Sequence, residues 1–187
     1  MVHIYCGDGK GKTTAALGLA VRAAGRGKKV LIARFLKTDD SGEVPVLSGI
    51  PGICVIPCKK TFGFYFRMDD RQKKEAAEYY SQLFEQTAAQ ADQFDLVILD
   101  EIMAACNYNL VAEDAVIQWL EGQKRAEKQE NGEEGRTEGK IKGAPEIVLT
   151  GRNPSAGIQK FADYITEMKM IRHPYEKGVE ARAGIEY

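Results

Sequence analysis

Glycines, lysines and threonines gather in one short run near the start of the chain, GDGKGKTT at positions 7–14. The run follows an apolar segment (2–6) that predicts a strand and precedes an alanine-rich segment (13–24) that predicts a helix. A glycine-rich turn in that setting points backbone N–H groups at a phosphate chain, and the helix N-terminus adds partial positive charge. Lys12 can reach the phosphates, and the Thr13 hydroxyl can ligate Mg²⁺. We expect a nucleotide-phosphate site formed by Gly7, Asp8, Gly9, Lys10, Gly11, Lys12, Thr13 and Thr14.

The run departs in length from the usual phosphate-loop pattern, G-x-x-x-x-G-K-[ST]. Counted back from Gly11, that pattern puts its first glycine at position 6, where this chain has Cys6. The glycine is Gly7 instead, so the loop is one residue shorter and must hold phosphates differently. This departure indicates chemistry other than ordinary γ-phosphoryl transfer. We expect Lys10, a second cation, to face either the phosphates or solvent.

Two carboxylates end a later apolar run, FDLVILDE at 94–101. In proteins with a phosphate loop, a buried strand that ends in a carboxylate holds Mg²⁺ directly or through water. Asp100 and Glu101 are therefore candidate metal ligands, together with Thr13. The alternative is that they serve as a helix N-cap and a first-turn acid.

Basic and amide side chains end the apolar run EIVLTGR at 146–152, where Arg152 is followed by Asn153. Ligands bind at the carboxyl ends of strands in parallel sheets, and a guanidinium group suits phosphate oxygens. We therefore expect both residues to meet a polyphosphate. A surface ion pair is the alternative role of Arg152.

These strand ends need a sheet to bring them together. Further strands are expected at 28–36, 53–57 and 163–168, and further helices at 70–92, 112–120 and 155–161. Alternating strands and helices indicate a parallel sheet, and nearly continuous apolar strands indicate burial on both faces. At roughly 150 residues per domain, the chain forms one domain, 1–187. The predicted fold class is α/β, a single P-loop NTPase-like (RecA-like) domain whose mostly parallel sheet is covered by helices on both faces.

The segment 121–143 differs in composition from the rest of the chain. It holds six acidic and six basic residues and five glycines, with Ala126 and Ile141 as its only aliphatic residues. Such a segment cannot bury enough apolar surface to hold itself in place, so we expect a mobile surface loop. The functional alternative is a docking loop for a partner.

Charge and hydropathy exclude several classes of protein. The net charge is −1, so the chain lacks the excess of positive charge that is typical of proteins that bind nucleic acid. No apolar run reaches the roughly 18 residues of a membrane helix, and the first residues lack the pattern of a signal peptide. The four cysteines are scattered, as reduced cytosolic thiols usually are. We expect a cytoplasmic protein that binds neither nucleic acid nor membrane.

Ordered motifs along nearly the whole chain resemble the P-loop family of ATP:corrinoid adenosyltransferases, which includes the cob(I)yrinic acid a,c-diamide and cob(I)alamin adenosyltransferases. The likeness runs from position 4 to 186. It includes the short phosphate loop within IYCGDGKGKTTAALGLAVRAAGRGKKVLIARFLK (4–37), SGE (41–43) and LDEI (99–102). The C-terminal run at 149–187 carries the family's TGR, AD-x-x-TEM, HP and GIE signatures.

This resemblance implies a reaction in which Co(I) of a reduced corrinoid attacks the 5′ carbon of ATP. A Co–C bond forms and triphosphate leaves. Co(I) is itself a strong nucleophile, so the protein has to position the reactants and neutralise the departing charge. The resemblance further implies Mg²⁺ as cofactor, an electron donor that reduces Co(II), and a homodimer.

Roles carry over from the family onto matching positions. Lys12 and Arg152 become the catalytic residues; Gly7 to Thr14, Arg152 and Asn153 bind ATP; Thr13, Asp100 and Glu101 bind Mg²⁺. The family's G-F-T-W segment, whose aromatic rings cover the corrinoid, reads GFYF at 63–66. Phe64 and Phe66 therefore become corrinoid-binding residues, with core packing as their alternative role.

Three departures from the family stand out: Phe66 replaces the tryptophan, an N-terminal extension found in some members does not precede the first strand, and the charged segment is longer.

Two other functions stay open at this stage. A P-loop small-molecule kinase would release ADP, and a nucleotide-dependent corrinoid carrier or switch would bind both ligands without turnover.

Overall fold

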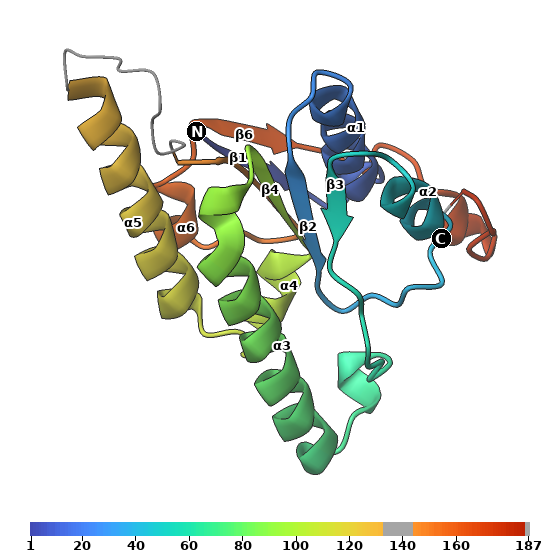
Figure 1. Cartoon of the computed structure of the whole chain (residues 1–187). Helices are drawn as coiled ribbons and strands as arrows, with labels where there is room; N and C mark the ends of the chain where they lie inside the picture. The colour runs from blue at the N-terminus through green and yellow to red at the C-terminus, as the bar shows by residue number, and fades with distance from the viewer. Residues whose placement is uncertain (133–143, 186–187) are drawn as a thin grey trace.

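We describe residues 1–132 and 144–185 of the chain in a computed structural model, which has six strands and six α-helices in that part (Figure 1). The strands are β1 (Val2–Cys6), β2 (Val30–Arg34), β3 (Ile53–Val55), β4 (Leu96–Asp100), β5 (Glu146–Thr150) and β6 (Tyr164–Glu167). The helices are α1 (Lys12–Ala24), α2 (Glu43–Ser48), α3 (Asp70–Gln90), α4 (Ile102–Asn107), α5 (Glu113–Gly132) and α6 (Ala156–Gln159). Short 3₁₀ turns lie at Tyr65–Arg67, Ala91–Gln93 and Pro174–Lys177.

The strands form one sheet in the order β3-β2-β4-β5-β1-β6. Every neighbouring pair is parallel, so the expected mostly parallel sheet is confirmed and is entirely parallel among the described residues. The register places Arg34 of β2 opposite Asp100 of β4, and Tyr5 of β1 opposite Thr150 of β5. The carboxyl ends of β1, β2, β4 and β5 therefore meet at one edge of the sheet.

Helices cover both faces of this sheet, which confirms the RecA-like α/β domain (Figure 1). Successive side chains of a strand point to opposite faces. Val30 and Ile32 of β2 accordingly pack with Ala16 and Ala20 of α1. On the other face, Leu31 belongs to a larger core with residues of α3, α4, α5 and α6. The alanines of α1 are the small side chains that let this helix lie close to the sheet.

The longest helix among the described residues, α3, has Asp69 as its N-cap. The Asp69 carboxylate accepts a hydrogen bond from the Gln72 N–H (2.7 Å), and the Gln72 side chain accepts one from the Asp69 N–H (3.0 Å). This reciprocal capping box satisfies two N–H groups that have no partner within the helix. Two short helices, α2 and α4, were not expected from the sequence.

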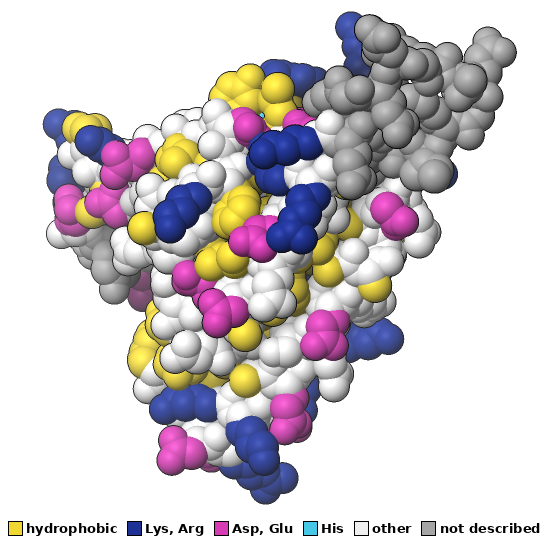
Figure 2. Space-filling model, turned by 90° about the vertical axis from the view of Figure 1, so that its left-hand side faces the viewer, with side chains coloured by type: hydrophobic (Ala, Val, Ile, Leu, Met, Phe, Trp, Pro, Cys, Tyr) yellow, Lys and Arg dark blue, Asp and Glu magenta, His cyan; other side chains and the backbone are white. Residues whose placement is uncertain are grey.

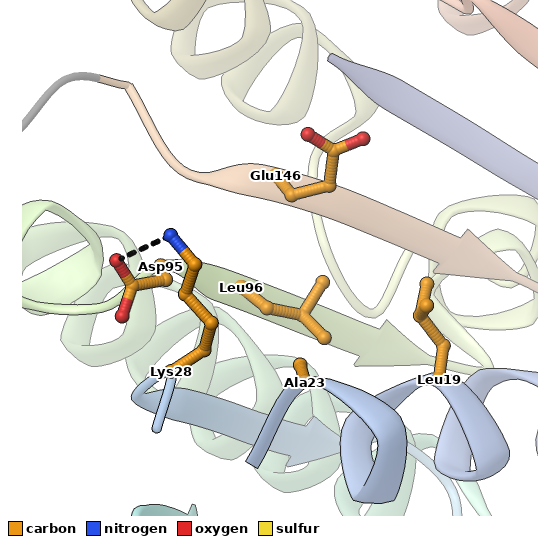
Figure 3. Close-up of a pocket in the computed structure, with 6 residues that line it drawn as sticks. All are labelled: Leu19, Ala23, Lys28, Asp95, Leu96 and Glu146. Carbon is orange, nitrogen blue, oxygen red and sulfur yellow. Dashed lines mark ion pairs between the residues drawn. The ribbon is translucent and has the colours of Figure 1, made fainter. Parts of the chain in front are cut away.

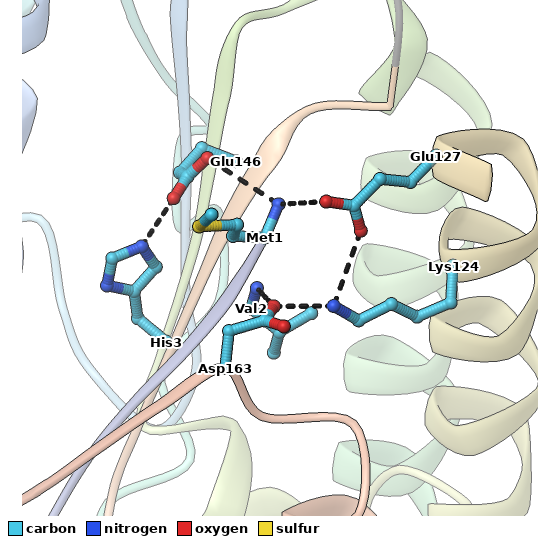
Figure 4. A network of polar contacts seen from close by, with 7 residues as sticks. All are labelled: Met1, Val2, His3, Lys124, Glu127, Glu146 and Asp163. Carbon is cyan, nitrogen blue, oxygen red and sulfur yellow. Dashed lines mark hydrogen bonds and ion pairs between the residues drawn. The ribbon is translucent and has the colours of Figure 1, made fainter. Parts of the chain in front are cut away.

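The expectation of a loop at 121–143 is wrong for residues 121–132, which continue helix α5 to Gly132. Glu121 and Arg125, four residues apart on this helix, lie 3.5 Å apart. Lys124 bonds the Asp163 carboxylate (2.5 Å) at the start of β6 and contacts Glu127 (3.3 Å), as Figure 4 shows. Charge pairs of this spacing stabilise a solvated helix. The remainder of the expected loop, 133–143, lies outside the described residues.

The start of β1 joins the same polar network (Figure 4). The Val2 N–H donates to Asp163 (2.6 Å), and Glu146 of β5 contacts the His3 ring (2.5 Å). The Met1 amine lies 3.5 Å from carboxylates of Glu127 and Glu146. Figure 2 shows the left-hand side of Figure 1, where acidic and basic side chains are interspersed with patches of hydrophobic atoms. Among the residues described, no helix has the length and apolar character needed to cross a membrane.

Candidate active site

The glycine-rich loop joins β1 to α1 at the carboxyl edge of the sheet. Gly7 (φ 104°) and Gly11 (φ 116°) both adopt backbone conformations that favour glycine, and Gly11 caps α1. Lys12 follows, and only 8% of it is exposed. Its Nζ donates to the Gly9 carbonyl (2.8 Å), so the ammonium folds back over the loop. Burial lowers the pKa of Lys12, which means that the loop holds a poorly hydrated cation.

Residues 168–170, which we call the C-terminal strap, run across the outside of this loop after β6. The Gly9 N–H donates to the Met168 carbonyl (2.7 Å), and the Met170 N–H donates to the Asp8 carboxylate (3.0 Å). This second bond holds the pKa of Asp8 below its ordinary value. A Cβ at Gly9 would lie 2.7 Å from the Met168 oxygen, and one at Gly7 would lie closer still. The strap therefore requires glycine at both positions.

Asp100 at the end of β4 is the centre of a buried polar cluster. Its side chain has no exposed surface. One carboxylate oxygen accepts hydrogen bonds from the Thr150 hydroxyl (2.6 Å) and the Thr13 hydroxyl (3.0 Å), and the other accepts one from Lys37 Nζ (2.5 Å). Thr150 also accepts the N–H of Glu101 (2.9 Å). The ends of β4 and β5 are thus joined to the first turn of α1.

Three residues with side chains adopt left-handed conformations just after three neighbouring strands: Leu36 (φ 55°), Glu101 (φ 61°) and Asn153 (φ 51°). Such conformations cost about 1–3 kcal/mol each and tend to cluster where the surroundings fix a functional geometry. Their gathering at the carboxyl edge of the sheet marks this edge as the candidate active site.

The pKa of the Glu101 carboxyl is raised above its ordinary value of 4.5, first by burial and then by the charge of Asp100. Ionised Glu101 therefore lowers the free energy of unfolding at neutral pH. We expect Glu101→Gln to raise the midpoint of thermal unfolding at pH 7 in metal-free buffer. A carboxyl whose folded pKa is raised adds stability as the pH falls, so the gain should shrink toward pH 4.

Thermal unfolding between pH 4 and 8 checks this, with Glu85→Gln on the exposed face of α3 as the control. A lower midpoint for Glu101→Gln at pH 7, or a gain that does not depend on pH, would contradict the argument.

A pocket of about 600 Å³ opens beside Lys12 and Glu101. Arg152 and Asn153 after β5 line it, as do Ala104, Asn107 and Tyr108 of α4 and its C-terminal end. The Arg152 guanidinium is exposed and donates to the Asp8 carbonyl (3.4 Å), which brings it to the glycine-rich loop. Two cations and one carboxylate therefore face a space large enough for a nucleotide phosphate chain.

The remaining loop residues of the expected site lie outside this pocket lining. Lys10 points outward, where its Nζ donates to the Ile185 carbonyl (2.7 Å). Thr14 is exposed on the first turn of α1, while Thr13 faces inward to Asp100. Lys10 is thus less well placed than Lys12 for a ligand in the pocket.

Phe64 and Phe66 form an exposed aromatic pair, with 64% and 74% of their surfaces accessible. Their rings stack with centroids 5.4 Å apart, and the Arg67 guanidinium lies 5.6 Å and 5.8 Å from the two centroids. Core packing, the alternative considered for these rings, is excluded by this exposure. Tyr65 between them stacks on Tyr108 (4.3 Å), which connects the pair to the pocket wall.

Two contributors to the site were not expected from the sequence, Lys37 and Tyr108. Lys37 is a cation directly after the apolar run of β2, the same signal that singled out Arg152 after β5. Tyr108 follows the unexpected helix α4, so nothing in the pattern pointed to it.

A smaller hollow of about 210 Å³ lies at the opposite edge of the sheet (Figure 3). Leu19 and Ala23 of α1 and Leu96 form its apolar part, and its one lysine, Lys28, pairs with Asp95 (3.7 Å). It lies at the amino ends of the strands, where ligands of such sheets do not usually bind. The larger pocket is the better candidate for the active site.

Comparison with known proteins decides the family. The sequence profile of the ATP:corrinoid adenosyltransferases BtuR/CobO/CobP matches residues 1–187, the full chain. The chain belongs to the ATP:corrinoid adenosyltransferase family. It is similar to the corrinoid adenosyltransferase of Escherichia coli strain K12, at 30% identity over all of this chain and 85% of the relative.

Two other similar members of the adenosyltransferase family are the corrinoid adenosyltransferases of Salmonella typhimurium and Pseudomonas aeruginosa. The first, named CobA, is 29% identical over 100% of this chain and 85% of its own length. The second is 28% identical over 98% of this chain and 82% of its own length. The resemblance drawn from the motifs is thereby confirmed, and the protein is an enzyme of the adenosyltransferase class.

Proposed function

We propose that the chain, acting as a single domain, transfers the 5′-deoxyadenosyl group of ATP to Co(I) of a reduced corrinoid. Co(I) supplies the electron pair of the new Co–C bond, and the C5′–O bond breaks so that triphosphate leaves with its own pair. The observation that carries this proposal is the pocket itself. The cations Lys12 and Arg152 line it together with Tyr108. Tyr65 stacks on Tyr108 and lies between Phe64 and Phe66 in the sequence, so the lining leads to these exposed rings.

For the triphosphate we propose the glycine-rich loop as a phosphate loop, with Lys12 and Arg152 as the catalytic residues. Both side chains neutralise charge that grows on the leaving oxygen. The Gly9 N–H is bonded to the Met168 carbonyl, so it does not donate to the triphosphate. Lys12 therefore neutralises a larger share of the negative charge than it would in a loop whose N–H groups are all free. Asp8 bonds the strap and so positions the loop. Asn153 and Thr14 complete the ATP site in this proposal, and Lys10 lies at its outer rim.

For Mg²⁺ we propose Thr13, Asp100 and Glu101 as ligands. Hard oxygen donors fit this ion, which often takes only one or two protein ligands besides water and phosphate. The Thr13 hydroxyl and the Asp100 carboxylate oxygen are 3.0 Å apart, and the Glu101 carboxylate faces the adjoining pocket. When bound, the ion would shield the negative charge of the triphosphate.

For the corrinoid we propose the exposed pair Phe64 and Phe66. Flat aromatic rings on a surface suit the apolar face of a macrocycle, and Arg67 holds both rings from one side.

Three broader features are also part of the proposal. A separate electron donor supplies Co(I), the location is the cytoplasm, where ATP and reductant are available, and the enzyme is a homodimer. The exposed edge strand β6 supports an interface, since unpaired edges are usually covered.

We expect Phe66→Ala to raise the KM for the corrinoid about tenfold, because a stacked ring contributes roughly 1.5 kcal/mol. The KM for ATP should stay within twofold or so of wild type, since the phosphate site is separate. Phe66→Trp should retain corrinoid affinity. Steady-state kinetics with both substrates check this, with Val46→Ala, another exposed apolar residue, as control. An unchanged corrinoid KM for Phe66→Ala would remove this ring from the proposal.

The proposed function is tested by mixing the protein anaerobically with ATP, Mg²⁺ and a chemically reduced corrinoid. The absorption spectrum should change to that of an alkylated cobalt only when ATP is present. A spectrum that shows corrinoid binding but never alkylation would indicate a carrier or switch and overturn the proposal.

A further inference from the structure

Lys37 occupies the centre of the proposed metal site. Its Nζ donates to the Thr13 hydroxyl (2.7 Å) and to Asp100 (2.5 Å), whose side chain is fully buried. Thr13 and Thr150 donate to the other oxygen of Asp100. A buried carboxylate needs a counter-charge, and the Lys37 ammonium supplies it.

The Thr13 hydroxyl and the Asp100 carboxylate, which hold the ammonium, are both proposed as ligands of Mg²⁺. A Mg²⁺ ion binds oxygen at about 2.0–2.1 Å, so the ion and the ammonium cannot share these contacts. We propose that Lys37 is a place-holding cation that neutralises Asp100 in the empty enzyme. When the metal–nucleotide arrives, Lys37 yields this position and contacts the triphosphate. This inference rests on the proposed magnesium site.

The backbone around Lys37 is fastened so that only its side chain has to move. The buried Arg34 guanidinium donates to the Thr38 carbonyl (2.8 Å) and pairs with Asp39. Asp39 also accepts the N–H of Cys58 (2.9 Å), and the Cys58 thiol donates to the Lys37 carbonyl (2.8 Å). These bonds join the segment after β2 to the segment after β3. The backbone of Lys37 is thus held in place, while its side chain donates a hydrogen bond to Thr13 in the first turn of α1.

Metal binding without nucleotide tests the competition directly. Mn²⁺ serves as the probe, and its free concentration is followed by electron paramagnetic resonance. Lys37→Gln should bind Mn²⁺ about tenfold more tightly than wild type, the effect of one charge-assisted hydrogen bond. Lys37→Arg keeps the charge and should bind like wild type. Lys160→Gln, an exposed lysine after α6, is the matched control.

ATP binding at a Mn²⁺ concentration that saturates the metal site of both proteins tests the proposed contact between Lys37 and the triphosphate. Lys37→Gln should bind ATP about tenfold more weakly than wild type, because a cation has been lost from the phosphate site. Thermal unfolding confirms that each variant folds. It provides a second readout, since Mn²⁺ should raise the midpoint of Lys37→Gln more than that of wild type.

The outcomes separate the two proposals. If wild type and Lys37→Gln bind Mn²⁺ equally, or if Lys37→Arg gains as much as Lys37→Gln, the place-holding role is wrong although the metal site stands. If Mn²⁺ binds neither protein, with or without ATP, the magnesium site itself fails and the inference with it.

Discussion

Replacing Lys12 by alanine is expected to lower kcat/KM for ATP about a thousandfold, the upper range for loss of one preorganised charge donor. The reason is the position of this ammonium, buried at the head of α1 and facing the pocket with Arg152. Burial lowers its pKa, so the empty protein gains little stability from the charge. The thermal unfolding midpoint of Lys12→Ala should therefore stay close to that of wild type.

Lys10→Ala is the comparison within the same loop. Its ammonium points outward to the Ile185 carbonyl, so we expect a loss of only a few-fold, as for a screened surface charge. Steady-state kinetics of adenosylation and thermal unfolding of both variants provide the measurements. If Lys12→Ala kept activity within tenfold or so of wild type, or if both lysines mattered equally, the loop would not work as argued.

Replacing Gly7 by alanine is expected to lower the free energy of unfolding by about 3 kcal/mol or more and to abolish ATP binding. Two independent causes act at this position. The backbone has φ 104°, a conformation that residues with side chains rarely adopt, and a Cβ would overlap the Met168 carbonyl. The C-terminal strap would have to move away from the loop that it holds.

Gly18→Ala is the matched control for that change. Gly18 lies on α1, where an added Cβ meets nothing within 4 Å, so alanine should raise the free energy of unfolding by roughly 0.5–1 kcal/mol. Chemical denaturation of both variants gives the two free energies. Similar losses for Gly7→Ala and Gly18→Ala would refute the role of the strap.

The sequence indicated the elements that hold the site because their signals are local. Buried parallel strands appear as apolar runs, and a glycine-rich turn before a small-residue helix is distinctive. The sequence could not indicate why two positions of the loop require glycine. Gly7 and Gly9 make room for Met168, some 160 positions later in the chain, and only the pairing of β6 with β1 brings the two together.

The misjudged segment 121–132 shows a different limit. Composition alone favoured a loop, yet Glu121 and Arg125 have the four-residue spacing of a helical charge pair. The decisive contact is tertiary, since Lys124 bonds Asp163 at the start of β6. Lys37 was missed for a similar reason. Its partner Asp100 lies 63 positions away, and the two meet only because β2 and β4 are neighbours.

The phosphate product of the reaction tests the central claim most directly. The protein is incubated anaerobically with ATP, Mg²⁺ and a chemically reduced corrinoid, and the phosphate species are separated and measured against alkylated corrinoid. The proposed chemistry predicts triphosphate in an amount equal to the adenosylated corrinoid. ADP in its place would show that the pocket transfers a phosphoryl group, as a kinase does, and would contradict it.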